Sequence, residues 1–244
     1  MAKEIKPIEK ISEGLAQQFA HIQPEGSWEI PRKAFHYSIG FLVLYLYKEG
    51  FETVDIYPAL TAFLCLVLTG EALRFSVPSF NVLYCNVLGP LMRKTEVSSR
   101  INGVAFYLAG CIFALYLFPK DIASLSIVYL SWADPTASIC GRLWGRYTPK
   151  FGKKSLAGTL GAIVIGAVVT FWFYAHLQGI SYDPAQSAAS LPLLALYGGL
   201  VAGVSEALGD SAGIDDNFVI PVLSSVFLWM FLVFLGLGSD TAAL

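Results

Sequence analysis

Seven apolar runs, two of them short, recur along the chain and are each bounded by charges, Gly or Pro; they lie at about 34–48, 57–73, 101–118, 122–133, 156–176, 191–208 and 218–236. A helix that crosses a bilayer needs about 20 apolar residues. Only 14% of the residues are charged and the mean hydropathy is +0.60, whereas about a quarter of the residues of a soluble domain carry a charge. The sequence therefore predicts an all-α, polytopic membrane protein of about seven transmembrane helices.

The run 122–133 is too short for a full crossing. It either forms half a helix or continues through Asp134 toward Gly141. Irregular backbone at membrane depth is tolerated only where protein or a water-filled cavity surrounds it. We therefore expect one helix to be broken near Asp134, in surroundings that matter for function.

The basic residues predict the orientation of the spans. If the N-terminus is cytosolic, the cytosolic segments are 1–33, 74–100, 134–155 and 209–217. Of the 16 Lys and Arg residues, only Lys48 and Lys120 fall outside these segments. Cytosolic loops carry an excess of Lys and Arg, so the N-terminus is expected inside and, with seven spans, the C-terminus outside.

The expected organisation is an N-terminal cytosolic segment, 1–30, followed by a single transmembrane domain, 31–238. Within 5–22 the apolar residues recur at steps of three and four, which is typical of one helix face. Such a helix lies either in the membrane interface or against the protein's own cytosolic face, and the residues leave both open.

Charge and cysteine content exclude several classes of function. The formal net charge is −2, which gives no basic field strong enough to hold a nucleic-acid backbone. Cys65, Cys85, Cys111 and Cys140 are far apart and form no C-x-x-C pair, so neither a structural zinc site nor a disulfide framework is expected. The sequence does not indicate an oligomeric state.

Residues that could carry chemistry gather in four clusters, all on the expected cytosolic side. In the first, Pro31 suits the start of a helix and places Arg32 and Lys33 in the first turn, where an anion would be stabilised. A positive-inside anchor is an equally good explanation of these two cations. In the second cluster, Glu71 and Arg74 lie three apart on one helix face, so we expect a structural ion pair.

The third cluster runs from Ser131 to Thr159. An acid that ends an apolar segment just before a proline is costly in a membrane, which favours a functional role for Asp134. Gly141 and Arg142 follow it, and Lys153 and Lys154 precede Ser155, a residue type that caps helix N-termini. The pattern suits a site where a metal and phosphate oxygens meet, although it is not a Walker loop.

The fourth cluster is acidic and contains Glu206, Asp210, Asp215 and Asp216. No Lys or Arg follows Lys154 in the chain, so these carboxylates must find their counter-charge elsewhere. They either cap helices and face water, or meet a divalent cation and the basic clusters. The opposite charge of the third cluster favours the second alternative.

Several motifs spread over about residues 30–230 resemble the fungal CTP-dependent diacylglycerol kinases, which belong with dolichol kinase, phytol kinase and CDP-diacylglycerol synthase in one CTP-transferase-like membrane family. They are Pro31–His36, Leu83–Cys85, Leu91–Lys94, Asp134 with Gly141–Arg142, Lys153–Gly158 and Asp215–Pro221. One departure is Pro135, where a small or hydroxylated residue would be expected.

The resemblance implies a multi-pass kinase of the endoplasmic reticulum and nuclear envelope, with its active site facing the cytosol. It implies phosphorylation of diacylglycerol to phosphatidate with CTP rather than ATP, and a divalent cation, Mg²⁺ or Ca²⁺. The family's essential basic pair falls on Arg32 and Lys33, its essential aspartate on Asp134 and its essential glycine on Gly141.

Taken together, the four polar clusters and the resemblance predict a mechanism in which the lipid hydroxyl attacks the γ-phosphate of CTP. The expected phosphate-binding residues are Arg32, Lys33, Arg142, Lys153 and Lys154. The expected metal ligands are Asp134 with one or more of Glu206, Asp210, Asp215 and Asp216, and which carboxylate accepts the hydroxyl proton stays open.

Three alternatives remain at this point. A polyprenol such as dolichol could replace diacylglycerol as acceptor, or a cytidylyl group could be transferred instead of a phosphoryl group. A transporter could use a broken helix at Asp134 to line a polar pathway, but the charged clusters crowd one face, which argues against it.

Overall fold

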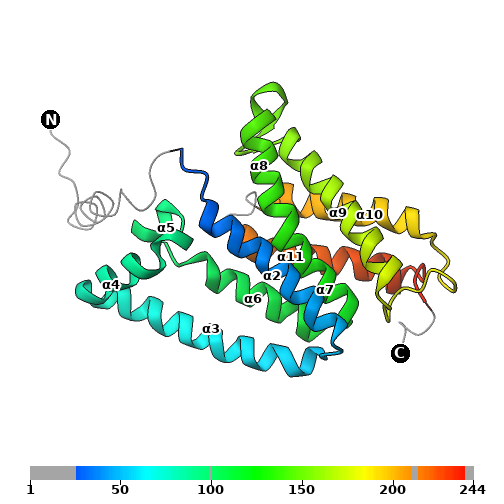
Figure 1. Ribbon diagram of the computed structural model, residues 1–244, viewed down its shortest axis with the longest axis horizontal. Coiled ribbons are helices and arrows are strands. Elements are labelled where there is room, and N and C mark those ends of the chain that lie inside the picture. Colours follow the sequence, from blue (N-terminus) through cyan, green and yellow to red (C-terminus); the bar gives the residue numbers. More distant parts are fainter. Residues whose placement is uncertain (1–25, 99, 210–213, 240–244) are drawn as a thin grey trace. The chain divides into compact units, whose positions relative to one another are not determined.

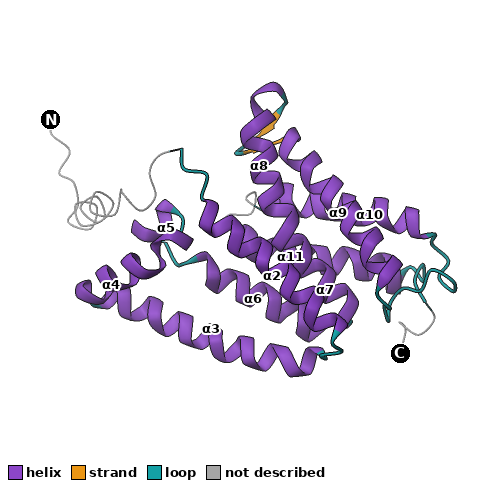
Figure 2. Cartoon of the chain, viewed as in Figure 1, coloured by secondary structure: helices purple, strands orange, loops and turns teal. Residues whose placement is uncertain are grey.

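The computed structural model describes residues 26–98, 100–209 and 214–239. These residues are mostly helical, and the strands among them form a single short β-hairpin (Figure 2). The predicted N-terminal amphipathic segment, 5–22, and Asp210 of the acidic cluster lie outside the described residues. The expected all-α class is therefore confirmed apart from this hairpin.

The chain forms two compact units, and their boundaries fall within helices α2, α3 and α6. One unit comprises the chain up to Phe35 together with Phe63–Ala105. The other comprises His36–Ala62 and the chain from Phe106 onward. We describe each unit by itself.

The first unit contains the start of α2 (Ile30–Lys48), the end of α3 (Thr53–Ser76), α4 (Pro78–Leu88), the 3₁₀ turn η1 (Gly89–Leu91), α5 (Lys94–Ser98) and the start of α6 (Gly103–Leu117). Its centre is polar. Arg74 donates to both carboxylate oxygens of Glu71, at 2.8 and 2.9 Å, and both residues are buried. Arg74 also donates to two backbone carbonyls, while Glu71 accepts from the backbone N–H of Asn102. The predicted structural ion pair is confirmed.

The second unit contains most of the helices (Figure 1). After the remaining parts of α2, α3 and α6 come α7 (Lys120–Val128), the π-turn η2 (Tyr129–Ala133), α8 (Asp134–Trp144) and the 3₁₀ turn η3 (Gly145–Tyr147). The hairpin strands β1 (Lys150–Phe151) and β2 (Lys154–Ser155) lead into α9 (Leu156–His176), and α10 (Leu191–Leu208), α11 (Asp216–Trp229) and the π-turn η4 (Met230–Phe234) follow. The predicted loop 177–190 contains no helix or strand.

Four helical segments in the described part of the chain have the length and hydropathy of a membrane span: α3, α9, α10 and Asp216–Phe234. α6 is apolar but has 15 residues, about 22 Å of helix, which is less than a bilayer core. On α3, side chains such as Phe63 and Leu66 are exposed to the surroundings, as lipid-facing residues would be. A membrane protein is thus supported, and the full count of seven spans stays a prediction.

Helices α9 and α10 pack through glycines. A Cβ atom built on Gly166 would lie 2.5 Å from the Cβ of Ala202 and 3.2 Å from the carbonyl oxygen of Gly198. Small residues let transmembrane helices approach this closely and so gain dispersion contacts. A buried hydrogen bond of 2.5 Å between the hydroxyls of Tyr129 and Thr170 adds a polar link between the π-turn and α9.

The prediction that a helix is broken near Asp134 is wrong, because the helix continues through this point with a wider turn. From Lys120 to Trp144 the backbone stays helical, and the five residues Tyr129–Ala133 form a π-turn directly before Asp134. The N–H of Asp134 donates to the carbonyl of Tyr129, five residues earlier. Pro135 has no N–H and its ring crowds the preceding turn, and a wider π-turn, often found at functional sites, accommodates it without interrupting the helix.

Candidate functional site

The third and fourth polar clusters meet around Lys154 in the second unit. The ammonium Nζ lies 2.7 Å from Oε1 of Glu206 and 3.7 Å from Oδ2 of Asp216. The other carboxylate oxygen of Glu206 accepts from the hydroxyl of Thr159, at 3.3 Å. The basic and acidic clusters therefore provide each other's counter-charge, as their opposite signs predicted.

Asp134 belongs to the same cluster. It is 8% exposed at the start of α8, and its carboxylate acts electrostatically on both Lys154 and Glu206. The π-turn and Pro135 fix the backbone at this point. Two carboxylates, from α10 and α11, thus contact the ammonium group of Lys154, and a third, from α8, interacts with it electrostatically.

The charge of Lys154 is strongly held. Burial lowers its pKa, but the negative charges of Asp134, Glu206 and Asp216 outweigh burial and raise the pKa from 10.5 to about 12. Lys154 is therefore a cation at every physiological pH. It is a fixed positive charge rather than a proton carrier.

The hairpin explains why Lys154 points inward while Lys153 does not. Gly152 adopts a positive φ of 61° and turns the chain back, so that Phe151 pairs with Lys154 and Lys150 with Ser155. Lys153 is exposed at the turn, whereas the Lys154 side chain is only 18% exposed. Ser155 then caps α9, as predicted, by accepting from the N–H of Gly158 at 3.3 Å.

Glycines bring α8 against the start of α9. A Cβ on Gly141 would lie 3.2 Å from Oγ of Ser155, and one on Gly145 would lie 2.8 Å from the same atom. A Cβ on Gly158 would lie 2.9 Å from the carbonyl oxygen of Ala137. The structure therefore gives Gly141 a packing role beside Lys154. Arg142, the next residue, is exposed.

The start of α11 completes the cluster. Asp215 is the N-cap of this helix and accepts from the N–H of Asn217 at 3.0 Å. Asp216 follows in the first turn and faces Lys154, and a Cβ on Gly209, just after α10, would lie 2.9 Å from the Cβ of Asp216. The two neighbouring carboxylates thus have different roles: one caps a helix and the other contacts the lysine.

Arg32 and Lys33 lie in the first unit, at the start of α2 as predicted. Arg32 pairs with Glu29, with 2.8 Å between NH2 and Oε2. Lys33 is 7% exposed and donates to the carbonyl of Trp28 at 2.7 Å. Glu96 is buried nearby: burial raises the pKa of its carboxyl, and interactions with Arg93 and Arg32 oppose the rise.

Two tyrosines near Asp134 were not singled out by the sequence. The Tyr37 hydroxyl bonds to Oγ1 of Thr136 at 2.7 Å, and the Tyr107 hydroxyl to Oγ of Ser131 at 2.7 Å. Both tyrosines interact electrostatically with Asp134. Tyr37 directly follows the first basic cluster, but Tyr107 lies within an apolar run and gave no signal of its own.

His36 belongs to this environment as well. Its ring meets that of Tyr107 edge to face, with centroids 5.3 Å apart, and it is 7% exposed. The contact is a packing interaction.

The described carboxylates near Lys154 are oxygen ligands of the type that the predicted divalent cation needs, but they do not form a complete ligand set. Among residues 26–98, 100–209 and 214–239, no three His, Cys, Asp or Glu side chains converge closely enough to form a ligand set by themselves. Mg²⁺ at phosphoryl-transfer sites is commonly held by one or two carboxylates and the substrate phosphates. Carboxylate oxygens from Asp134, Glu206 and Asp216 are ligands of the right type for such a site.

Three curated fungal proteins named CTP-dependent diacylglycerol kinase 1 are similar to this chain. That of Schizosaccharomyces pombe is 44% identical over 204 residues, which cover 83% of this chain and 93% of the relative. That of Saccharomyces cerevisiae is 42% identical over 212 residues, or 82% and 72%. That of Eremothecium gossypii is 43% identical over 217 residues, or 84% and 68%. No family model and no solved structure matches the chain.

Proposed function

The chain belongs to the family of CTP-dependent diacylglycerol kinases, and we propose that it transfers the γ-phosphate of CTP to diacylglycerol, giving phosphatidate and CDP. The likeness to three kinases over more than four fifths of the chain supports this lipid kinase activity. One structural observation carries the assignment of the site: Lys154 of the β-hairpin, whose side chain is 18% exposed, contacts the carboxylates of Glu206 and Asp216 and interacts electrostatically with that of Asp134.

Phosphoryl transfer depends on positioning and on neutralising the charge of the phosphates. Lys154 supplies a positive charge that does not titrate, and Glu206 and Asp216 hold its ammonium in place. The exposed cations Arg142 and Lys153 stand beside the start of α9, where they reach a nucleotide that arrives from water. Arg32 and Lys33 are assigned to phosphate binding by the family motif.

Asp134 is assigned as the central carboxylate of the reaction. It is buried and coupled to Lys154 and Glu206, and the helix carrying it is shaped by the π-turn. One carboxylate of this cluster accepts the proton of the attacking hydroxyl. Binding the lipid and nucleotide in line at this point supplies most of the rate enhancement.

We further propose that the site takes a divalent cation, Mg²⁺ or Ca²⁺. Asp134 with one or more of Glu206, Asp210, Asp215 and Asp216 would supply carboxylate ligands, and the CTP phosphates would supply further oxygens. When bound, the ion would neutralise negative charge on the CTP phosphates.

The proposed location is the membrane of the endoplasmic reticulum and nuclear envelope, with the Lys154 cluster facing the cytosol, where CTP is available. The charge bias supports this orientation, since the Lys and Arg residues other than Lys48 and Lys120 fall in the segments expected on that side. We keep residues 31–238 as the proposed catalytic domain.

The test is a kinase assay with purified protein in detergent, diacylglycerol, Mg²⁺ and γ-labelled CTP or ATP. Label in chloroform-soluble phosphatidate from CTP, with release of CDP, is the expected result. Release of pyrophosphate would instead indicate cytidylyl transfer. Transfer to dolichol but not to diacylglycerol would identify dolichol as the acceptor. Transfer to no lipid would overturn the kinase assignment.

Substitutions of Asp134, compared with a control substitution elsewhere, distinguish a role in catalysis from a general loss of folding. Asp134→Ala and Asp134→Asn should abolish phosphatidate formation while the protein remains inserted and elutes as a single species in detergent. Asp55→Asn is the matched control, because Asp55 is an exposed carboxylate in the first turn of α3. Near-normal turnover by Asp134→Asn would contradict the assigned role.

A further inference from the structure

Two lysines stand apart from the rest of the basic residues. Lys48 and Lys120 are the Lys and Arg residues that lie outside the segments expected in the cytosol. Although they are far apart in the sequence, the structure brings them to the same cavity, at the end of α2 and the start of α7. Such a convergence has no explanation in the proposed kinase site.

This cavity is polar and open. Its volume is about 450 Å³, and Tyr47, Lys48, Glu52, Lys120 and His176 line it together with residues 177–180. Lys120 pairs with Glu52 across 3.1 Å, and its Nζ lies 5.0 Å from the centre of the Tyr47 ring. Glu52 sits in the connection between α2 and α3, and its side chain is 58% exposed.

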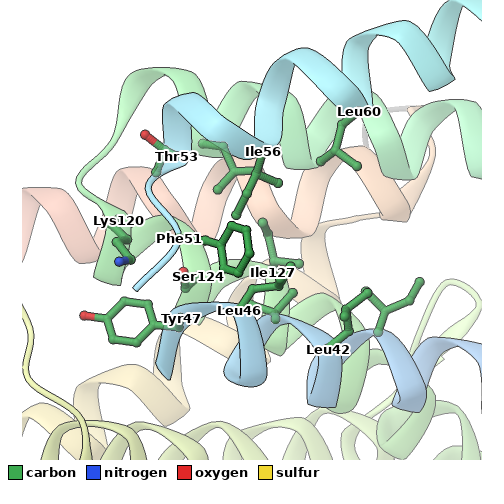
Figure 3. A pocket seen from close by; sticks show the side chains of 13 residues that line it. Leu42, Leu46, Tyr47, Phe51, Thr53, Ile56, Leu60, Lys120, Ser124 and Ile127 are labelled. Atoms are coloured by element: carbon green, nitrogen blue, oxygen red, sulfur yellow. The ribbon is translucent and has the colours of Figure 1, made fainter. Parts of the chain in front are cut away.

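A second, almost entirely apolar cavity of about 100 Å³ adjoins the first and shares Tyr47 and Lys120 with it. The aliphatic side chains that line it include Leu42, Leu46, Ile56, Leu60 and Ile127 (Figure 3). In Figure 3 the Tyr47 hydroxyl and the Lys120 ammonium lie at one end and Leu42 and Leu60 at the other, with the Phe51 ring between. The pair of cavities is therefore a polar chamber joined to an apolar channel.

The polar cavity and the kinase site lie at opposite ends of α9. His176, which lines the polar cavity, ends α9, and Lys154 and Ser155 directly precede its first residue. A helix of 21 residues is about 30 Å long, the thickness of the hydrocarbon core of a bilayer. The polar cavity thus lies at the opposite membrane boundary from Lys154.

We propose that these joined cavities bind an anionic phospholipid of that opposite leaflet, with its phosphate between Lys48 and Lys120 and one acyl chain in the apolar channel. A polar cavity lined by Lys48 and Lys120, with Lys120 also lining the adjoining apolar channel, matches a lipid that joins a phosphate to a hydrocarbon chain. Free phosphate would leave the channel unused, and a neutral lipid would leave the lysines unused. The Glu52 carboxylate competes for Lys120, and its exposed side chain can swing away. This site is independent of the substrate assigned above.

The first test uses the unaltered protein. Detergent-purified kinase is incubated with phosphatidylglycerol that carries a diazirine in one acyl chain, irradiated and digested. Label is expected in peptides that span 39–60 and 115–127. Label spread over all helices, or equal labelling by the corresponding phosphatidylcholine, would overturn the proposal.

The second test measures retained lipid by native mass spectrometry after adding phosphatidylglycerol. Lys48→Gln with Lys120→Gln, and separately Ile56→Phe, which narrows the channel, should each reduce retention at least fivefold. Glu52→Gln should increase it severalfold, because the competing carboxylate loses its charge. This gain distinguishes the site from general misfolding.

Lys150→Gln, an exposed lysine of the hairpin, is the matched control and should retain as much lipid as the unaltered protein. Unchanged retention in the double lysine variant would refute the phosphate position. Displacement of the lipid by millimolar glycerol phosphate would show that phosphate alone suffices and would refute the role of the channel.

Discussion

The ammonium group of Lys154 lies 2.7 Å from a carboxylate oxygen of Glu206, a residue 52 positions further along the chain. This ion pair joins the β-hairpin before α9 to the end of α10, and Asp216 adds a second carboxylate at 3.7 Å. Glu206 is 3% exposed and the Lys154 side chain is 18% exposed, so the acidic side of the pair is buried. Breaking one side of a buried pair leaves an uncompensated charge and is costly.

Replacement of Glu206 by Gln should therefore lower kinase activity at least tenfold and destabilise the protein by about 1–3 kcal/mol. The amide keeps the shape of the side chain but no longer balances Lys154. The measurements are phosphatidate formation and thermal unfolding in detergent. Glu49→Gln, an exposed acid after α2, should change neither, and unimpaired activity of Glu206→Gln would contradict the proposed positioning of Lys154.

The charge of Lys154 should not depend on pH in the neutral range. Its pKa in the folded protein, about 12, is above the unfolded value of 10.5, so its electrostatic contribution to stability is complete below the unfolded pKa and is lost as the pH rises toward 12. The difference in unfolding midpoint between the unaltered protein and Lys154→Met should thus stay constant across the neutral and mildly alkaline range.

Lys154→Arg is the control for this prediction, because it keeps the charge and changes the shape. Its activity should show the same dependence on pH as the unaltered protein, even if the rate is lower. An alkaline loss of activity that disappears in Lys154→Arg would show that Lys154 titrates within the working range and would refute the assignment.

The packing of Gly141 against Ser155 can be tested by a double-variant cycle. In Gly141→Ala the new Cβ would lie 3.2 Å from Oγ of Ser155, so the hairpin must shift and activity should fall. Ser155→Ala removes this oxygen but also the cap of α9, at a cost of about 1 kcal/mol. Combined, the two substitutions should cost less activity than the sum of the single effects. If the effects of the two substitutions on activity were additive, the contact with Ser155 would not explain the role of Gly141.

The approach of α9 to α10 should depend on Gly166. A Cβ there would lie 2.5 Å from that of Ala202, so Gly166→Ala should destabilise the protein by about 1–3 kcal/mol through overpacking. On the same helix, Val164 is 60% exposed, and Val164→Ala should have little effect. Unfolding in detergent measures both, and equal midpoints for the two variants would contradict the packing described.

Glu71 should matter for stability but not for chemistry. Glu71→Gln leaves the buried Arg74 guanidinium without its charge partner, at an expected cost of about 3–5 kcal/mol. Activity per folded molecule should stay within about twofold of the unaltered protein. A large loss of activity in correctly folded Glu71→Gln would instead give the pair a functional role.

The convergence of charge could be predicted in part. The third cluster was basic and the fourth acidic, and charges of opposite sign near a membrane must compensate one another, so a meeting of Lys153–Lys154 with Glu206 and Asp216 was foreseeable. Which lysine turns inward was not, because that depends on the register of a two-residue hairpin and the positive φ of Gly152. The separate roles of Asp215 and Asp216 likewise follow from where α11 begins.

The apolar runs alone determined that the chain is a helical membrane protein, since backbone groups in lipid must bond within a helix. Local residue types also determined the cap at Ser155 and the Glu71–Arg74 pair, because these contacts join residues within four positions of each other. Only the tertiary structure decided that the helix bearing Asp134 continues through a π-turn, that Tyr107 lies near this aspartate, and that Lys48 and Lys120 share a cavity. The last two relationships join segments far apart in the sequence, and the packing of whole helices sets them.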